Sequence, residues 1–296
     1  MRTLAFLSTK GGSGKSTLCL NIGAALAKHF GQRVLIIDLD GMACVTSALA
    51  SEPYQFDQSI GEVVLGRQSF DALVRPTEVE NLFVVPGSPD MLNIDTWDNA
   101  GIAVPSLLDD QGRILPNRLA ASLAQMKTRF EYVLFDCPGG VRTIEVMALM
   151  ACGEVIIPTA VSSFDFQGIF PSIDLIESVQ GLRAETPSRP RILGIIVNQT
   201  GKAGIPENIQ NDIGGFAPLF SPVRSSAALR TSPGALNMSK RTLVTAKPET
   251  QASLSLIQVA REIHEGIAAA RADNFERQQA EASALVELAE LAKEEV

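Results

Sequence analysis

Short apolar runs alternate along the chain with longer segments in which Ala, Leu and Ile recur at helical spacing. The short runs predict β-strands at residues 3–8, 33–38, 82–86, 132–136, 154–158 and 191–198. The helical spacing predicts helices at residues 16–29, 117–129, 142–151 and 166–182. Because the strands are apolar at nearly every position, we expect both faces of the sheet to be buried. The pattern predicts an α/β fold, with a doubly wound, mostly parallel sheet flanked by helices.

Two segments depart from this alternation. Residues 87–116 mix Pro and Gly with Asp and Asn, which predicts a long loop or short helices inserted between strands. That insertion is either a partner surface or a simple surface excursion. The last segment, 271–296, is rich in helix formers and carries seven acidic against three basic residues. We therefore expect one domain over residues 1–270, followed by an acidic C-terminal helix or tail over residues 271–296.

The composition is that of a soluble globular protein. Of the 296 residues, 46% are hydrophobic and 20% are charged. The apolar runs are far shorter than the roughly 20 residues that cross a bilayer, and the N-terminus lacks the pattern of a secretory signal. We expect a cytoplasmic protein with no membrane partner.

The charge is unevenly distributed. The formal net charge is −8, which argues against a chain that coats nucleic acid over its whole surface. Residues 213–248, however, contain no Asp or Glu. This acid-free span carries five basic residues: Arg224, Arg230, Lys240, Arg241 and Lys247. It is either a solvated surface that happens to gather bases or an electrostatic site for a polyanion.

A glycine-rich loop follows the first predicted strand. Residues 8–17 are "STKGGSGKST", and the helix predicted over residues 16–29 begins at the end of this stretch. Backbone N–H groups of such a loop, at a helix N-terminus, bind phosphate through hydrogen bonds and the helix dipole. Lys15 would reach the β- and γ-phosphates, and the Ser16 hydroxyl would bind Mg²⁺. The general pattern G-x-x-x-x-G-K-[ST] fails at its first position, which is Thr9.

Acidic residues end two of the predicted strands. Asp38 closes "VLIID", Asp40 follows just beyond it, and Asp136 closes "YVLFD". Hard cations take oxygen ligands, so carboxylates at the ends of neighbouring strands suit a Mg²⁺ site beside a phosphate loop. We expect Ser16, Asp38 and Asp136 to support the metal.

Together these motifs resemble the ParA/MinD superfamily of deviant Walker A ATPases. "KGGSGKST" is similar to the deviant Walker A motif, "VLIIDLDG" to the second acidic motif and "FDCPGG" to Walker B; the similarity extends through "EVIIPT", "GIIVNQ" and the "KRTLVTAKPETQASLSLIQVAREI" region. The resemblance covers most of residues 1–270. It implies a seven- or eight-stranded, mostly parallel sheet and a homodimer that forms when ATP is bound.

The resemblance also implies roles for individual residues. Lys10 would reach across the dimer to the partner subunit's phosphates, while Lys15 acts in its own site. Asp40 would orient or activate the attacking water, with Lys10, Lys15 and Asp40 as the catalytic set. Thr17 would bind the α-phosphate and Asn198 would lie near adenine. The expected nucleotide-binding residues are Gly11, Gly12, Ser13, Gly14, Lys15, Ser16, Thr17 and Asn198.

One departure from the family pattern concerns the hydrolysis rate. Family members commonly have Pro after the second acidic motif, where this chain has Gly41. Glycine loosens a switch segment whose movement reports the γ-phosphate. We expect slow ATP turnover that a partner and DNA stimulate.

Within the superfamily, the sequence is most similar to ParA-type partitioning ATPases. The first predicted strand begins at residue 3, which leaves no room for an N-terminal helix-turn-helix. The five bases of the acid-free span suit non-specific contacts to double-stranded DNA, placing the protein on the nucleoid. A ParB-like or other adaptor would link it to a plasmid, chromosome or protein cargo. Two alternatives remain: a MinD-like protein, which the acidic C-terminus disfavours, and a regulatory scaffold with little turnover.

Overall fold

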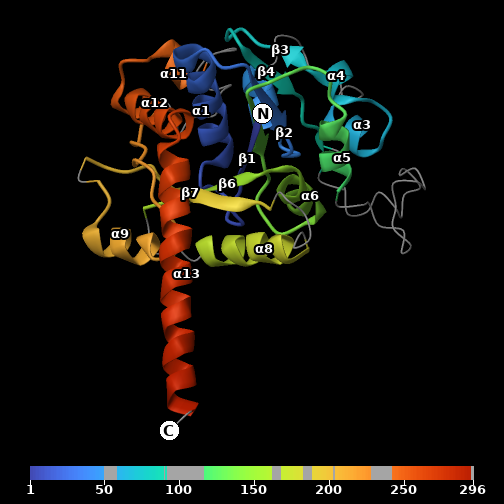
Figure 1. Ribbon diagram of the computed structural model, residues 1–296. Helices are drawn as coiled ribbons and strands as arrows, with labels where there is room; N and C mark the ends of the chain where they lie inside the picture. The colour runs from blue at the N-terminus through green and yellow to red at the C-terminus, as the bar shows by residue number, and fades with distance from the viewer. Residues whose placement is uncertain are drawn as a thin grey trace.

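The computed structural model describes residues 1–49, 59–89, 91, 117–161, 168–182, 189–202, 204–227 and 242–294, with only the backbone at 281 and 285–294. A seven-stranded sheet forms the centre of the molecule (Figure 1), in the order β3-β4-β2-β5-β1-β6-β7. Its strands are β1 (Arg2–Phe6), β2 (Val34–Asp38), β3 (Arg75–Pro76), β4 (Leu82–Val85), β5 (Tyr132–Asp136), β6 (Glu154–Ala160) and β7 (Arg191–Asn198). All pairs are parallel except β3 with β4.

Helices cover both faces of this sheet. One face packs against α1 (Lys15–Phe30), α2 (Cys44–Leu49), α11 (Leu243–Ala246), α12 (Gln251–His264) and the start of α13 (Ile267–Glu294). The other packs against α3 (Ile60–Val64), α4 (Phe70–Leu73), α5 (Arg118–Ala124), α6 (Thr143–Ala151), α8 (Ile169–Leu182) and α9 (Glu207–Gly214). Successive buried residues of the longer strands enter opposite cores, as in β1, where Leu4 belongs to one and Ala5 to the other.

The predicted α/β fold is confirmed, and the six predicted strands are present with ends within two residues of those expected. The prediction missed β3, which is only two residues long, and the helices α2, α3, α4, α9, α11 and α12, of which α12 has 14 residues. The helix predicted over residues 117–129 ends at Ala124. Of the predicted insertion, residues 90 and 92–116 lie outside the described part of the chain, so its proposed role is untested.

An irregular segment lines the outer edge of β7. The Ile195 N–H donates to the Pro218 carbonyl (2.8 Å), the Val223 N–H to the Val197 carbonyl (3.0 Å), and the Ser225 N–H to the Thr200 carbonyl (2.9 Å). Isolated parallel bridges join Ile195 with Leu219 and Thr200 with Arg224. Residues 218–225 therefore occupy the place of an eighth strand and satisfy an edge that is otherwise open to pairing.

Helix α13 is anchored to the sheet at its N-terminal end and then projects away from the rest of the molecule (Figure 1). Arg191 pairs with Asp273 of α13 and with Glu154 (3.1 Å), and Glu154 pairs in turn with Arg2 (2.8 Å). The domain boundary expected after residue 270 lies inside this continuous helix.

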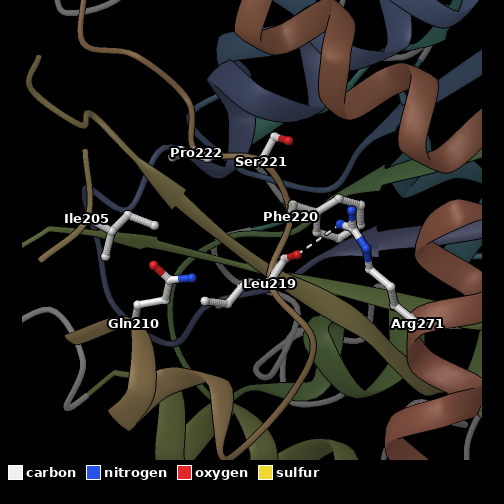
Figure 2. Close-up of a pocket in the computed structure, with 7 residues that line it drawn as sticks. All are labelled: Ile205, Gln210, Leu219, Phe220, Ser221, Pro222 and Arg271. Atoms are coloured by element: carbon white, nitrogen blue, oxygen red, sulfur yellow. Dashed lines mark hydrogen bonds between the residues drawn. The ribbon is translucent and has the colours of Figure 1, made fainter. Parts of the chain in front are cut away.

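A second anchor of α13 borders a cavity of about 270 Å³. Arg271 donates from Nη1 to the Leu219 carbonyl (3.1 Å) and to the buried carboxylate of Glu262 (2.9 Å), and Figure 2 shows the first of these bonds. Glu262 also accepts from the backbone N–H of Ser221 (3.3 Å). The start of α13 thereby fixes the segment along β7. Across the described residues, no helix is both long and apolar enough to pass through a lipid bilayer.

The contact between Gly194 and the edge segment yields a prediction. A Cβ at Gly194 would lie 2.7 Å from the Pro218 carbonyl oxygen and 2.9 Å from the Phe220 ring. Gly194→Ala should therefore lower the free energy of unfolding by about 1–3 kcal/mol, measured by urea denaturation. Gly181 in α8 has no atom within 4 Å of such a Cβ, so Gly181→Ala is the matched control and should be neutral or slightly stabilising. Equal stability of the two variants would contradict the close packing.

Candidate functional site

The carboxyl ends of β1, β5 and β2 meet at one edge of the sheet. Phe6, the last residue of β1, is in register with Asp136 of β5, and Asp136 is in register with Asp38 of β2. The glycine loop follows β1 at this edge and leads into α1. Strand register alone thus brings the loop and both predicted carboxylates together, where ligands of open α/β sheets bind.

The glycine loop adopts a conformation that requires glycine. Gly12 and Gly14 have φ of 80° and 92°, in the left-handed region that other residues rarely enter. A Cβ at Gly14 would lie 2.1 Å from Nδ2 of Asn198, which donates to the Ser13 carbonyl (3.2 Å). Asn198, expected near adenine, therefore braces the loop from the end of β7.

Thr9, which breaks the general loop pattern, has partners in α8 and just before it. Its N–H donates to Ser172 Oγ (3.1 Å) and its hydroxyl to the Gly168 carbonyl (3.1 Å). The side chain that replaces glycine at this position thus ties the start of the loop to α8.

Lys15 is buried at the centre of the site. Its Nζ donates to the Lys10 carbonyl (3.1 Å) and lies beside Gly139, the second residue after Cys137 in the loop that follows β5. A Cβ at Gly139 would lie 3.4 Å from this Nζ and 3.6 Å from the Gly11 nitrogen. Burial lowers the pKa of Lys15, and the charge of Asp136 offsets part of that effect.

Asp38 is fully buried and held by a residue that the sequence did not single out. Its Oδ2 accepts from the Thr46 hydroxyl (2.6 Å) and the Thr46 N–H (2.8 Å), and its Oδ1 accepts from the Asp40 N–H (3.2 Å). Burial raises the pKa of Asp38 to about 6, and the bonds from Thr46 oppose the rise. Gly87 packs against this carboxyl so closely that a Cβ there would lie 2.9 Å from its carbon.

Asp136 is fully buried, and neither of its carboxylate oxygens has a hydrogen-bond partner among the residues described. Burial raises its pKa well above the usual range, and the nearby Asp38 carboxylate raises it further. The Ser16 hydroxyl and Lys15 lie near enough to oppose this, although Ser16 does not meet the geometry of a hydrogen bond to either oxygen. Such a carboxylate is costly to leave unpaired, so this position favours an added cation.

Asp40 lies in a turn that follows β2. It is half-buried; its Oδ1 accepts from the Met42 N–H (2.9 Å) and its carbonyl from the Ala43 N–H (2.8 Å). Ala43 has φ of 49°, a left-handed conformation that is uncommon for a residue with a side chain. The turn that contains Gly41 is thus closed by local hydrogen bonds and one strained residue.

The other predicted loop residues surround this centre. Gly11 is exposed, Lys10, Ser16 and Thr17 are half-buried, and Ser13 is buried. The Ser13 hydroxyl has no hydrogen-bond partner within the described part of the chain. No three His, Cys, Asp or Glu side chains in the described residues form a metal-binding group. A Mg²⁺ ion here would rely on Ser16, Asp38 and Asp136 with water and phosphate oxygens, which suits its preference for retained waters.

Two of the five bases of the acid-free span are described. Arg224 donates from Nη1 to the Gly201 carbonyl, and its N–H donates to Ser255 Oγ (3.1 Å). Lys247 is exposed directly after α11. Arg230, Lys240 and Arg241 lie outside the described residues.

Asn21 is a connection that the sequence analysis missed. It is buried inside α1, where its Nδ2 donates to the Thr17 carbonyl (2.8 Å) and its Oδ1 accepts from the Leu243 N–H (2.9 Å). The helix that carries Ser16 and Thr17 is thereby bonded to the start of α11, next to Lys247. A polar residue at a helical core position was the only signal in the sequence.

Known proteins are similar to this chain in sequence and in fold. The profile of the AAA domain family matches residues 1–186. The chromosome-partitioning ATPase Soj of Treponema pallidum is 30% identical over 179 residues, which are 60% of this chain and 65% of that protein. The match thus spans slightly less than two thirds of Soj. A ParA family protein of Chlamydia trachomatis is 30% identical over 220 residues, 73% of this chain and 80% of the relative.

Solved structures agree in fold at lower identity. Cobyrinic acid a,c-diamide synthase of Mycobacterium smegmatis, solved with ADP and magnesium, superposes with a TM-score of 0.71 at 21% identity, covering 92% of this chain and 97% of that one. The cell division ATPase MinD of Pyrococcus furiosus gives a TM-score of 0.66 at 23% identity, covering 89% and 98%. The domain profile and the Chlamydia relative, together with the loop and the strand-end carboxylates, show that the chain belongs to the ParA family, within the ParA/MinD superfamily of ATPases.

Proposed function

We propose that this protein hydrolyses ATP slowly, dimerises when ATP is bound, binds DNA without sequence preference and positions a cargo from the nucleoid in the cytoplasm. The observation that carries the proposal is the buried carboxylate of Asp136, which has no hydrogen-bond partner among the described residues and lies beside Lys15 and the glycine loop. A magnesium–nucleotide complex supplies the cation that this carboxylate lacks and the phosphates that the loop N–H groups fit.

The chain's own residues suit phosphoryl transfer to water. The loop N–H groups and Lys15 bind the β- and γ-phosphates, and the Ser16 hydroxyl, Asp38 and Asp136 hold Mg²⁺. When bound, Mg²⁺ neutralises charge that develops on the phosphate oxygens. Asp40 orients the attacking water from the strained turn that follows β2. Slow turnover follows if this turn, with Gly41 in place of proline, samples the productive geometry only part of the time.

The negative charge of a bound triphosphate gives a physical reason for dimerisation. A triphosphate brings more negative charge than Lys15 alone neutralises, in a site that already holds two buried carboxylates. Lys10 of the partner subunit supplies a second cation when two copies meet across the nucleotide. ATP then holds the dimer together, and hydrolysis releases it.

DNA binding uses the acid-free span. Lys247, which is exposed, and Arg224, which is half-buried, lie on the side of the sheet covered by α11 and α12. Arg230, Lys240 and Arg241 extend the basic run in the sequence. A surface of this kind contacts phosphates and carries no base-specific readout, so binding should depend strongly on salt. A ParB-like adaptor or another cargo protein then stimulates hydrolysis and sets the cargo, which is a plasmid, a chromosome or a protein assembly.

A prediction about Asp40 distinguishes an ATP-hydrolysing enzyme from a scaffold that binds nucleotide without turnover. Asp40→Ala should lower ATP turnover at least tenfold, because the water loses its orienting carboxylate, while nucleotide affinity changes only a few-fold. Phosphate release and nucleotide binding are measured with and without DNA. Glu80→Ala, an exposed acid just before β4, is the control and should match wild type. Equal turnover of the Asp40 variant and wild type would favour the scaffold.

The second prediction concerns DNA. Lys247→Glu should weaken retention of duplex DNA by the ATP-bound protein at least tenfold and reduce the slope of log affinity against log salt by about 0.9, one phosphate contact. Lys127→Glu makes the same charge change just after α5, on the opposite face of the sheet, and should leave both quantities unchanged. If both variants bind alike, the surface lies elsewhere.

The third prediction follows from the buried carboxyl of Asp38. Its pKa, raised to about 6 in the folded chain, exceeds the value near 4 in the unfolded chain, so folding takes up a proton between these values. The contribution of Asp38 to the free energy of unfolding is most favourable below about pH 4 and is lost as pH rises through about 6. The loss is roughly 3 kcal/mol. Urea denaturation of nucleotide-free protein across this window should show a smaller loss in Asp38→Asn than in wild type, because Asp136, whose pKa is also raised, still takes up a proton on folding. The same dependence of the free energy of unfolding on pH in wild type and in Asp38→Asn would contradict the raised pKa of Asp38.

A further inference from the structure

An arginine ends the loop that joins β5 to α6, beside the candidate nucleotide site. This loop, residues 137–142, runs along Lys15 at Gly139, where an added Cβ would lie 3.4 Å from the Lys15 Nζ. At the next residue, Gly140, an added Cβ would lie 3.7 Å from Nε of Arg142. Neighbouring residues of one loop therefore adjoin both cationic side chains.

The guanidinium group of Arg142 lacks a good partner in this position. Its Nε is buried and has no hydrogen-bond partner among the residues described. Arg142 forms an ion pair with Oε1 of Glu145, but at 3.9 Å the two atoms are too far apart for a hydrogen bond. A buried donor without an acceptor is unfavourable, so an anion that reached this group would gain a strong, charge-assisted hydrogen bond.

Glu145 connects this arginine to the charges of the site. Its side chain is fully buried in the first turn of α6, where Oε2 accepts from the Arg142 N–H (3.1 Å). Burial lowers the pKa of Lys15, and the charge of Glu145 is among those that oppose this effect. Glu145 therefore lies within electrostatic range of both cations, and its ion pair keeps Arg142 beside the site.

The loop that carries Arg142 is held by few hydrogen bonds. Gly139, Gly140 and Val141 take part in no backbone–backbone hydrogen bond within the described part of the chain. Val141 is 59% exposed, and Gly140 has φ of 139°, a conformation that favours glycine. Exposed segments with few hydrogen bonds open at a low cost in free energy. The loop can therefore carry the guanidinium group from Glu145 toward a bound phosphate.

We propose that Arg142 is a further catalytic residue, which binds the γ-phosphate of ATP and stabilises the charge of the transition state. This assignment, which rests on the proposed ATPase function, gives the site a second cation from the same chain. Its planar N–H groups match two phosphate oxygens at once, which an ammonium group does not.

The reaction itself is unchanged by this assignment. The water oxygen forms a bond to the γ-phosphorus, and the bond from that phosphorus to the oxygen of the β-phosphate breaks. ADP leaves with the electron pair of the broken bond, and one proton of the water passes to solvent. Arg142 forms no covalent bond and offsets negative charge on the γ-phosphate oxygens, an effect that is greatest in the transition state.

The test separates binding of the transition state from folding and from binding of ADP. Wild type and Arg142→Gln are compared in ATP turnover, in affinity for ADP with magnesium, and in affinity for ADP with magnesium and aluminium fluoride, which imitates the phosphoryl group in the transition state. Arg142→Gln should lower kcat and weaken the aluminium fluoride complex by at least about tenfold. Affinity for ADP alone should change less than about twofold, because ADP has no γ-phosphate.

Three further variants isolate the guanidinium group. Arg142→Lys should recover only part of the turnover, because it restores the charge without the planar N–H groups. Added guanidinium ion should restore part of the turnover of Arg142→Ala. Arg129→Gln removes the same charge from an exposed residue just before β5, at the opposite edge of the sheet, and should match wild type. Thermal melts exclude unfolded variants.

Two results would overturn the proposal while leaving the ATPase in place. One is turnover of folded Arg142→Gln equal to that of wild type. The other is an equal loss of affinity for ADP and for the aluminium fluoride complex, which would assign Arg142 a structural role. Wild type without any ATP turnover would instead contradict the proposed function itself, and the assignment with it.

Discussion

The structure depends on two carboxylates that the central sheet buries side by side. Asp38 and Asp136 are register partners at the ends of neighbouring strands, and both are fully buried. Lys15 supplies positive charge beside them, while Thr46 supplies neutral hydrogen bonds to Asp38 alone. Like charges buried together are unfavourable unless a proton or a cation joins them. The site is therefore poised for a cation, and the glycine loop sits where that cation's phosphate ligands would lie.

The parts of this site that the sequence predicted are those fixed by strand order and local backbone chemistry. The carboxyl ends of parallel strands meet at the same edge of a sheet. Asp38 and Asp136, which end two predicted strands, were therefore expected near the glycine loop that follows the first strand. The glycines at positions 12 and 14 were predictable because their left-handed backbone excludes most side chains. The six longer strands were predictable because nearly every one of their residues enters one of the two cores.

What the sequence could not predict depends on contacts between distant residues. Asn21 reaches Leu243 across 222 positions, and Thr46 bonds Asp38 from a helix of only six residues, too short to show a period. Gly139 matters because it approaches Lys15 and Gly11, which only the folded loop brings near. The exposed ring pair of Phe170 and Phe216 joins two helices that are separate in the sequence.

The central claim is that a triphosphate joins two copies of this chain, with Lys10 of each copy neutralising charge in the other's site. The most direct measurement is the solution mass of Asp40→Ala, which we expect to hydrolyse ATP more slowly than wild type, by light scattering with ATP and magnesium. We expect twice the mass of a single chain, and a single-chain mass when ATP is replaced by ADP or when Lys10→Ala is added. A single-chain mass for Asp40→Ala at saturating ATP would contradict the claim.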